Sequence, residues 1–117
     1  MRLRKQISGV LIANWERAPT LLDCPTLAQS MDLSARALAR RLAREGTTFT
    51  RVLDEICFER AHPMLRSGTP AIEVASALGY AELSSFFRAF RRWTGGLTPS
   101  EFRRVGGRGR PRLDSGS

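Results

Sequence analysis

One helical pattern occurs twice in this sequence, and the repeat constrains the fold more than any other feature. Each copy begins with an alanine, an apolar residue three positions later and then a turn residue, and it continues with an arginine that lies between two apolar residues. The first copy reads Ala28-x-x-Met31-Asp32 and then Leu38-x-Arg40-x-Leu42. The second copy reads Ala75-x-x-Leu78-Gly79 and then Phe86-x-Arg88-x-Phe90. Both copies end at a Gly-x-Thr break, at residues 46–48 and 96–98. Because breaks and apolar positions correspond, the pattern predicts a duplicated unit of short helix, tight turn and longer helix.

Outside the repeats the apolar residues also follow helical spacing, and the alternation typical of strands is absent. A first helix is expected where one face collects five apolar residues: Leu3, Ile7, Val10, Leu11 and Trp15. Between the copies, Thr48 is expected to cap a long helix toward Leu65, which Pro63 ends or bends near His62. The chain is therefore predicted to be all-α, with about seven helices in two helix-turn-helix subdomains joined by a long linker helix.

Capping residues predict where the helices begin and end. Four helix starts are expected where a side chain can accept a backbone N–H, or where proline can occupy the first turn: Thr26 with Gln29, Ser34, Thr69 with Pro70, and Thr98 with Pro99. Gly46 and Gly79 are expected helix stops. Gly79 supplies a left-handed turn residue, and Asp32 is a tolerated substitute at the corresponding turn.

These signals divide the chain into a domain over residues 1–104 and a basic tail over residues 105–117. Within the domain, the first helix-turn-helix is expected at 20–46, the linker helix at 48–65 and the second helix-turn-helix at 70–104. From Gly106 onward the tail has no apolar anchor and is predicted to be disordered.

The basic residues are almost all arginine, and they exceed the acidic residues. Lys and Arg total 19 against 11 Asp and Glu, for a net charge of +8, and Lys5 is the only lysine. The planar guanidinium suits phosphates and guanine edges, so nucleic acid is favoured over a membrane surface as the partner. The chain lacks an apolar run of the roughly 20 residues that a membrane span needs, and lacks a secretory signal. We therefore expect a cytoplasmic protein with no membrane partner.

The sequence contains few residues that could support metal binding or catalysis. Cys24, Cys57 and His62 are the only cysteines and histidine, and none lies in a metal-ligand motif or beside a catalytic partner. We expect no metal, no cofactor and no enzymatic activity, and interpret both cysteines as small buried apolar residues.

The duplicated unit is laid out like a helix-turn-helix, whose second helix enters the major groove of DNA. On the first such helix the candidate DNA-binding residues are Arg36, Ala37, Arg40, Arg41 and Arg44. On the second they are Leu83, Ser84, Ser85, Phe87, Arg88, Arg91 and Arg92. For any single arginine the alternative is an ordinary solvated surface. A linker of 18 residues, about 27 Å if helical, would let the two helices read consecutive major grooves.

A family resemblance supports this interpretation. Residues 74–95, closing with Thr98-Pro99-Ser100-Glu101-Phe102-Arg103, resemble the signature of the AraC/XylS family of bacterial transcription regulators. The first copy is similar to the other helix-turn-helix of that family at Leu27-Ala28, Leu33-Ser34, Arg36, Leu38, Arg40, Leu42, Gly46, Phe49 and Leu53. The resemblance implies a seven-helix unit that binds double-stranded DNA at promoters, often as an activator that contacts RNA polymerase.

Carried over position by position, the base-reading places of the family fall on Arg36, Ala37, Ala39 and Arg40, and on Leu83, Ser84, Ser85, Phe87 and Arg88. The apolar residues among them can contact only apolar groups such as a thymine methyl. For Phe87 a core position is favoured over a DNA contact, and Phe86 and Phe90 are assigned to the core.

The chain departs from the family pattern in three places. Gly96 lies one residue farther from Phe90 than usual, Cys57 replaces a common basic residue, and a proline at position 63 is rare. These departures affect how the two helix-turn-helix units are placed relative to each other. The chain also holds no region that could sense an effector, so we expect either a stand-alone regulator or the DNA-binding end of a longer protein.

Two further interpretations remain open at this point. The tail segment Gly107-Arg108-Gly109-Arg110-Pro111-Arg112 is similar to the core of AT-hook motifs, which bind the minor groove of A/T-rich DNA; the alternative is a solvated tail that adds charge. The alternative to sequence-specific DNA binding is a basic protein that binds DNA without specificity, or RNA. The absence of aromatic residues for base stacking on the basic faces argues against RNA.

Overall fold

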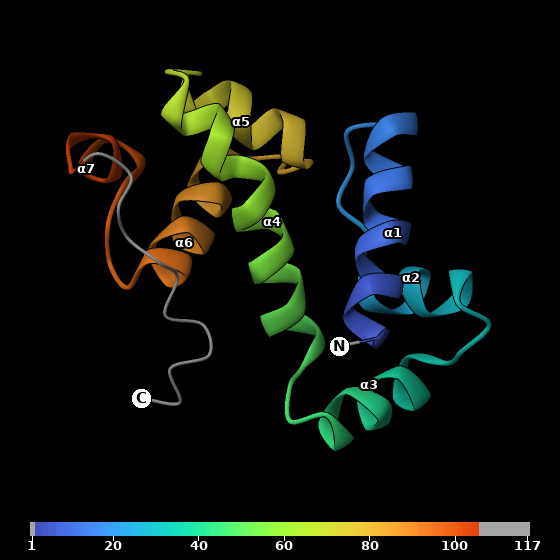
Figure 1. Cartoon of the computed structure of the whole chain (residues 1–117). Helices are drawn as coiled ribbons and strands as arrows, with labels where there is room; N and C mark the ends of the chain where they lie inside the picture. The colour runs from blue at the N-terminus through green and yellow to red at the C-terminus, as the bar shows by residue number, and fades with distance from the viewer. Residues whose placement is uncertain (1, 106–117) are drawn as a thin grey trace.

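The computed structural model describes residues 2–105, which form seven α-helices and no strand (Figure 1). The helices are α1 (Arg2–Arg17), α2 (Cys24–Ser30), α3 (Ala35–Arg44), α4 (Phe49–Arg66), α5 (Ala71–Leu78), α6 (Leu83–Thr94) and α7 (Pro99–Arg104). The predicted all-α class is confirmed. The predictions of a disordered tail and of a minor-groove motif concern residues 106–117, which lie outside the described residues.

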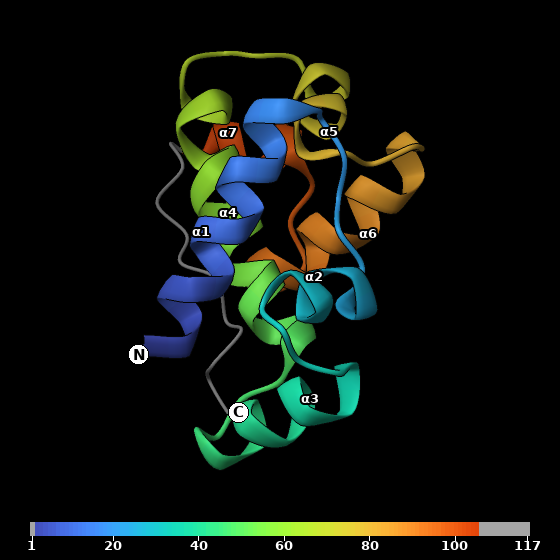
Figure 2. The ribbon, with the colours of Figure 1, turned by 90° about the vertical axis from the view of Figure 1, so that its right-hand side faces the viewer.

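The long helix α4 is the centre of the molecule. It packs against α3, α5, α6 and α7. In Figure 1, α1, α2 and α3 lie to the right of α4, α6 and α7 lie to its left, and α5 lies across its upper end, while Figure 2 shows α3 at the lower end of the molecule. The molecule measures 41 × 35 × 22 Å, so the two helical groups form a flattened body. None of the helices between residues 2 and 105 is long and apolar enough to cross a membrane.

Helix α4 continues past the point where Pro63 was predicted to interrupt it. The helix ends at Arg66, so Pro63 lies in the last turn, where it is solvent-exposed. The predicted end near His62 was therefore wrong, and the alternative of a bend there stays a prediction. The missing N–H of a proline removes one bond to the carbonyl four residues earlier, and near a helix end few further bonds depend on it. The carbonyl of Pro63 still accepts the N–H of Ser67 at 3.0 Å.

Three predicted caps are confirmed. Ser34, Thr48 and Thr98 each accept, through the side-chain oxygen, the backbone N–H three residues farther along. The carboxylate of Glu101 accepts the backbone N–H of Thr98 in return, which completes a capping box at the start of α7. This hydrogen bond lowers the pKa of Glu101. Each cap satisfies an N–H group that has no partner inside the helix.

Two predicted starts were wrong. Thr26 was expected to cap α2, but the Asp23 carboxylate accepts the Thr26 N–H at 2.8 Å, so the helix begins at Cys24. At α5 the N-cap is Pro70, because the hydroxyl of Thr69 pairs with the hydroxyl of Ser67 at 3.2 Å instead of capping the helix. At α2, where Asp23 and Thr26 lie close together, the spacing alone does not decide which of them caps the helix.

The two helix-turn-helix turns have the backbone that the repeat predicted. Asp32 has φ = 60° and Gly79 has φ = 100°, and Asp32 is the only non-glycine residue with positive φ among those described. The residue after each left-handed position makes the same hydrogen bond, since the N–H of Leu33 donates to the carbonyl of Ala28 and the N–H of Tyr80 to the carbonyl of Ala75. The two turns therefore have corresponding local geometry.

The core is continuous through both groups of helices. Leu27, Leu38 and Leu42 are fully buried in the first unit, and Phe86, Phe90 and Trp93 in the second. The assignment of Phe86 and Phe90 to the core is thus confirmed. Helix α1 buries Leu3, Ile7, Leu11 and Trp15, whereas Val10, predicted on the same face, is half-buried.

The two cysteines differ in their environments. Cys57 is fully buried in α4, as predicted, and burial together with the charge of Asp54 raises the pKa of its thiol to about 12. Cys24 is only half-buried at the start of α2, so the prediction that both are buried was wrong for this residue. The Cys24 side chain packs against the core on one side and remains partly open to solvent on the other.

We expect the two thiols to react at different rates, because the thiolate is the reactive species and access is required. In the folded protein at pH 8, a thiol reagent should modify Cys24 and leave Cys57 unmodified. Both should react after unfolding in denaturant. A Cys24→Ser variant provides the control, since its folded form should show almost no reaction in the same assay. Rapid labelling of that variant would contradict the burial of Cys57.

Candidate nucleic-acid interface

The first candidate helix, α3, has one buried stripe and one arginine-rich face. Leu38 and Leu42 are fully buried, and this fixes the rotation of the helix about its axis. Ala37 is half-buried, and the four arginines of the helix are consequently exposed: Arg36, Arg40, Arg41 and Arg44. A shallow hollow of about 200 Å³ on this face is lined by Ala37, Arg40, Arg41 and Arg44. The predicted residues of the first unit therefore form one continuous basic surface, with Arg36 one turn before Arg40.

The second candidate helix, α6, is oriented by a larger apolar stripe. Phe86, Ala89, Phe90 and Trp93 are buried. The exposed residues are Ser84, Arg88, Arg91 and Arg92, and the half-buried residues are Leu83, Ser85 and Phe87. An N–H of the Arg88 guanidinium donates to the Ser85 hydroxyl at 3.2 Å, one turn earlier. The polar N-terminal turns of α6 and its central arginine thus share one side of the helix.

Phe87 occupies the boundary between core and surface. Its ring centroid lies 6.1 Å from that of Phe86, and it packs against the margin of the core. The same side chain is partly open to solvent. Phe87 therefore packs partly on the core, the position that the sequence favoured over a DNA contact.

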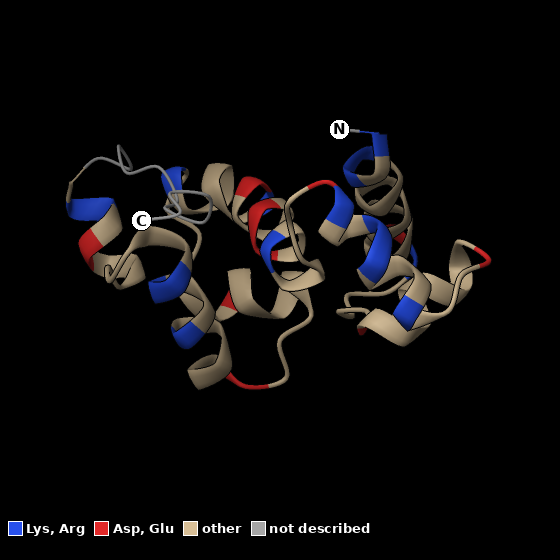
Figure 3. Cartoon of the chain, turned by 90° about the horizontal axis from the view of Figure 1, so that it is seen from below, with Lys and Arg blue, Asp and Glu red and all other residues tan. Residues whose placement is uncertain are grey.

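Charge is distributed unevenly between the helices. Figure 3 shows basic residues along α3 and α6, and acidic residues of α4 between these two helices. The acidic residues of α4 are Asp54, Glu55 and Glu59, and all three take part in ion pairs within the protein. Pairing neutralises these carboxylates locally, so they oppose an approaching polyanion less than their number indicates.

Arg92, one of the predicted DNA-binding residues, is held by a buried carboxylate. Its Nε donates to one oxygen of Asp54 at 2.6 Å, and its Nη2 donates to the other at 2.7 Å. The indole N–H of Trp93 donates to Asp54 at 2.9 Å as well. The Asp54 side chain is 5% exposed and that of Arg92 is 51% exposed. The hydrogen bonds to Asp54 raise the pKa of Arg92. The pair fastens α6 to α4 across 38 positions of sequence.

A second long-range connection joins the first group of helices to the turn of the second unit. The indole N–H of Trp15 in α1 donates to the carbonyl of Leu78 at 2.9 Å. The loop after α1 passes so close to Gly79 that a Cβ atom there would lie 2.8 Å from the Thr20 Cα. Asn14 holds this loop by donating to the carbonyl and the hydroxyl of Thr20, both at 2.9 Å. The two units are thus connected through this contact as well as through α4.

The extra residue before α7 is accommodated in a turn that contains two glycines. Gly95 has φ = 76° and Gly96 has φ = 122°, conformations that other residues rarely adopt. The hydroxyl of Thr94 accepts the N–H of Leu97 at 3.0 Å across this turn. Phe102 of α7 is fully buried, so the last helix remains packed on the core despite the insertion.

Sequence patterns did not reveal the Asp54–Arg92 pair or the Trp15–Leu78 bond. Both join residues that are distant in the chain, and no local spacing marks them. Within residues 2–105 there is also no group of three or more His, Cys, Asp or Glu side chains placed to hold a metal ion.

Two helix-turn-helix units with arginines exposed on their second helices define a class, the DNA-binding domains of bacterial transcription regulators. A family model described as "Helix-turn-helix domain" matches residues 27–105. The chain belongs to this family, which is the AraC type of helix-turn-helix domain. Its relatives include transcription regulators.

Individual relatives agree with this assignment. The HTH-type transcriptional regulator VqsM of Pseudomonas aeruginosa is 39% identical over 102 residues, which are 86% of this chain and 30% of VqsM. The uncharacterized HTH-type transcriptional regulator Rv1395 of Mycobacterium tuberculosis is 43% identical over 89 residues, 75% of this chain and 25% of that protein. The chain thus spans less than a third of the length of these relatives.

Solved structures show the same fold. The crystal structure of the transcriptional regulator CdpR from Pseudomonas aeruginosa superposes with a TM-score of 0.74 at 36% identity, covering 87% of this chain and 31% of CdpR. A DNA-binding transcriptional dual regulator from Escherichia coli K-12 superposes with a TM-score of 0.73 at 24% identity, covering 90% of this chain and 92% of that one.

Proposed function

We propose that this domain binds double-stranded DNA sequence-specifically and thereby regulates transcription, with α3 and α6 entering consecutive major grooves. The observation that carries the proposal is the equivalence of the two helices. Each is the second helix of its unit, each buries an apolar stripe, and each exposes arginines on the opposite face. The longest dimension of the molecule, 41 Å, exceeds the roughly 34 Å of one duplex turn, so one molecule is long enough to reach both grooves.

The exposed side chains divide into two roles in this proposal. Arg36 and Arg40 on α3, and Ser84 and Arg88 on α6, contact base edges, because arginine can bond guanine at two points and serine bonds several bases. Of the other exposed arginines on these two helices, those at 41, 44 and 91 contact phosphates and fix the register on the duplex, whereas Arg92 is paired with Asp54. Ala37 and Leu83 offer apolar contacts to thymine methyl groups.

Selection from a pool of random duplexes tests the two-helix arrangement. Sequencing of the bound duplexes should recover two short boxes whose centres lie about ten base pairs apart. Recovery of a single box would show that one unit has only a structural role. Competition with structured RNA separates specific DNA binding from general polyanion binding, since equal competition by RNA contradicts the proposal.

Removing a base-reading arginine should weaken and broaden recognition. We expect Arg40→Ala and Arg88→Ala each to cost about 1–3 kcal/mol on the selected duplex and to relax specificity only in their own box. The control is Arg66→Ala at the end of α4, an exposed arginine outside both recognition helices, which should change the affinity little.

The salt dependence of binding measures the contribution of contacts with phosphates. For the parent protein, we expect the arginines at 41, 44 and 91 and other basic residues near the duplex to make about six to eight phosphate contacts in total, which gives a log–log slope of affinity against salt of about −5 to −7. If Arg40→Ala and Arg88→Ala weaken cognate and random duplexes equally, those residues act only on phosphates.

A further inference from the structure

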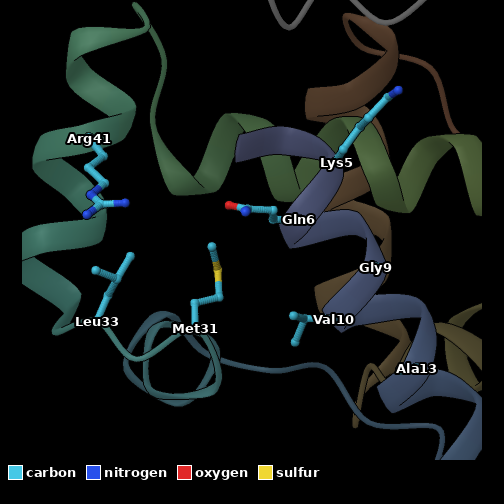
Figure 4. Close-up of a pocket in the computed structure, with 8 residues that line it drawn as sticks. All are labelled: Lys5, Gln6, Gly9, Val10, Ala13, Met31, Leu33 and Arg41. Atoms are coloured by element: carbon cyan, nitrogen blue, oxygen red, sulfur yellow. The ribbon is translucent and has the colours of Figure 1, made fainter. Parts of the chain in front are cut away.

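A groove lies between α1 and the α2–α3 pair, beside the recognition surface but separate from its base-reading residues. Its wider part is a hollow of about 520 Å³ (Figure 4). An adjoining hollow of about 300 Å³ shares Val10 and Ala13 with it and continues along α1 as far as Arg17. The two hollows together follow one side of α1 for most of its length.

The groove offers an apolar surface that the domain itself does not cover. Val10, Met31 and Leu33 are half-buried, packed against the core on one side and open to the groove on the other. In Figure 4, Val10 stands on the α1 side, and Met31 and Leu33 stand opposite. A Cβ atom at Gly9 would meet nothing within 4 Å, so α1 leaves room here for another chain to approach closely.

The ends of the groove are basic. Lys5 and Arg41 line the wider part and Arg17 lines the narrower part, whereas no Asp or Glu lines either hollow. None of these three side chains belongs to the ion pairs found among residues 2–105. An apolar centre between positive ends is complementary to an apolar surface flanked by carboxylates.

We propose that this groove is the docking site of an acidic amphipathic helix from a partner protein. From Lys5 to Arg17, α1 rises about 18 Å, so a docked helix of three to four turns matches the length of the groove. Apolar side chains one turn apart would pack on Val10, Met31 and Leu33, and acidic side chains near the helix ends would meet Lys5, Arg41 and Arg17. Nucleic acid fits less well, because phosphates gain nothing from the apolar centre.

The test uses a designed peptide and the intact protein. The probe is a fluorescein-labelled helix of about 14 residues with leucines on one face and glutamates at both ends. The control peptide has the same composition in an order that forms no apolar face. At physiological salt, fluorescence anisotropy should show micromolar binding of the first peptide and at least tenfold weaker binding of the second. In methyl NMR spectra, the resonances of Val10, Met31 and Leu33 should shift on binding.

Two variants locate the site. Gly9→Phe places a ring in the groove and should weaken the peptide at least tenfold, whereas the matched control Gly9→Ala should bind it like the parent. Lys5→Glu combined with Arg17→Glu should weaken the acidic peptide and favour a peptide with lysines at its ends. These variants omit Arg41, which is also a candidate DNA contact. Circular dichroism should confirm that each variant is folded.

Three results would overturn the proposal: equal binding of the two peptides, undiminished binding to Gly9→Phe, or no binding of the designed helix at millimolar concentration. If Gly9→Phe instead weakens binding to duplex DNA, the groove belongs to the nucleic-acid interface. Retention of duplex binding by Gly9→Phe keeps this test separate from the proposed DNA-binding function.

Discussion

Replacing Gly79 with alanine is expected to lower the free energy of unfolding by about 3 kcal/mol, the sum of backbone strain and overpacking. Gly79 has φ = 100°, which L side chains rarely adopt. An added Cβ would also lie 2.8 Å from the Thr20 Cα and closer still to the backbone nitrogen of Leu21. Because these neighbours are backbone atoms, the loop after α1 must move away, and the Trp15–Leu78 hydrogen bond beside it is lost or weakened.

Gly46→Ala is the matched control. Gly46 also has positive φ, at 79°, but a Cβ there would meet nothing within 4 Å. The control therefore includes the backbone strain without the steric clash, and we expect it to cost about 1–2 kcal/mol. Urea unfolding followed by circular dichroism measures both variants. Equal losses at the two positions would show that the loop does not press on Gly79.

Asp54→Ala is expected to cost about 3 kcal/mol, because the variant leaves hydrogen-bond donors of α6 without their acceptor. The indole N–H of Trp93 is buried and would have no partner. Arg92 is half-exposed and can turn to water, which limits the loss. The orientation of α6 on α4 should loosen, so binding to the second DNA box should weaken more than binding to the first.

The neighbouring acid provides the control. Glu55 pairs with Arg4 at 3.1 Å, but both side chains are about a quarter exposed, at 27% and 26%. Glu55→Ala should cost less than about 1 kcal/mol, as is usual for surface ion pairs. Thermal unfolding separates the two variants. A loss for Asp54→Ala no larger than for Glu55→Ala would show that the buried pair contributes little net stability.

The features of the fold that depend on local periodicity could be predicted from the sequence. The apolar residues Phe86 and Phe90 were assigned to the core from their spacing, and they fix the face that α6 (Leu83–Thr94) buries. Capping side chains predicted the starts of α3 at Ser34 and of α4 at Thr48 correctly. They indicated the wrong residue at α2, where Asp23 and Thr26 compete for the same position.

Interactions between distant residues could not be predicted in this way. An arginine on a helix surface has the same local sequence pattern whether it faces solvent, as Arg88 does, or binds a buried carboxylate, as Arg92 does. Only the fold brings Asp54 within reach. The prediction of an exposed arginine face therefore holds for α3 and α6, while the partner of each arginine depends on the tertiary structure.

The two equivalent turns differ in how many residue types they tolerate at the left-handed position. At position 32 the chain already carries a side chain in the left-handed conformation, and this residue is exposed, so asparagine or glycine can replace Asp32. At position 79 the neighbouring loop occupies the space that any side chain would need. A library randomised at both codons should retain several residues at the first turn and glycine alone at the second. Although the chain builds the same bend twice, one bend is open to sequence drift and the other is closed to it.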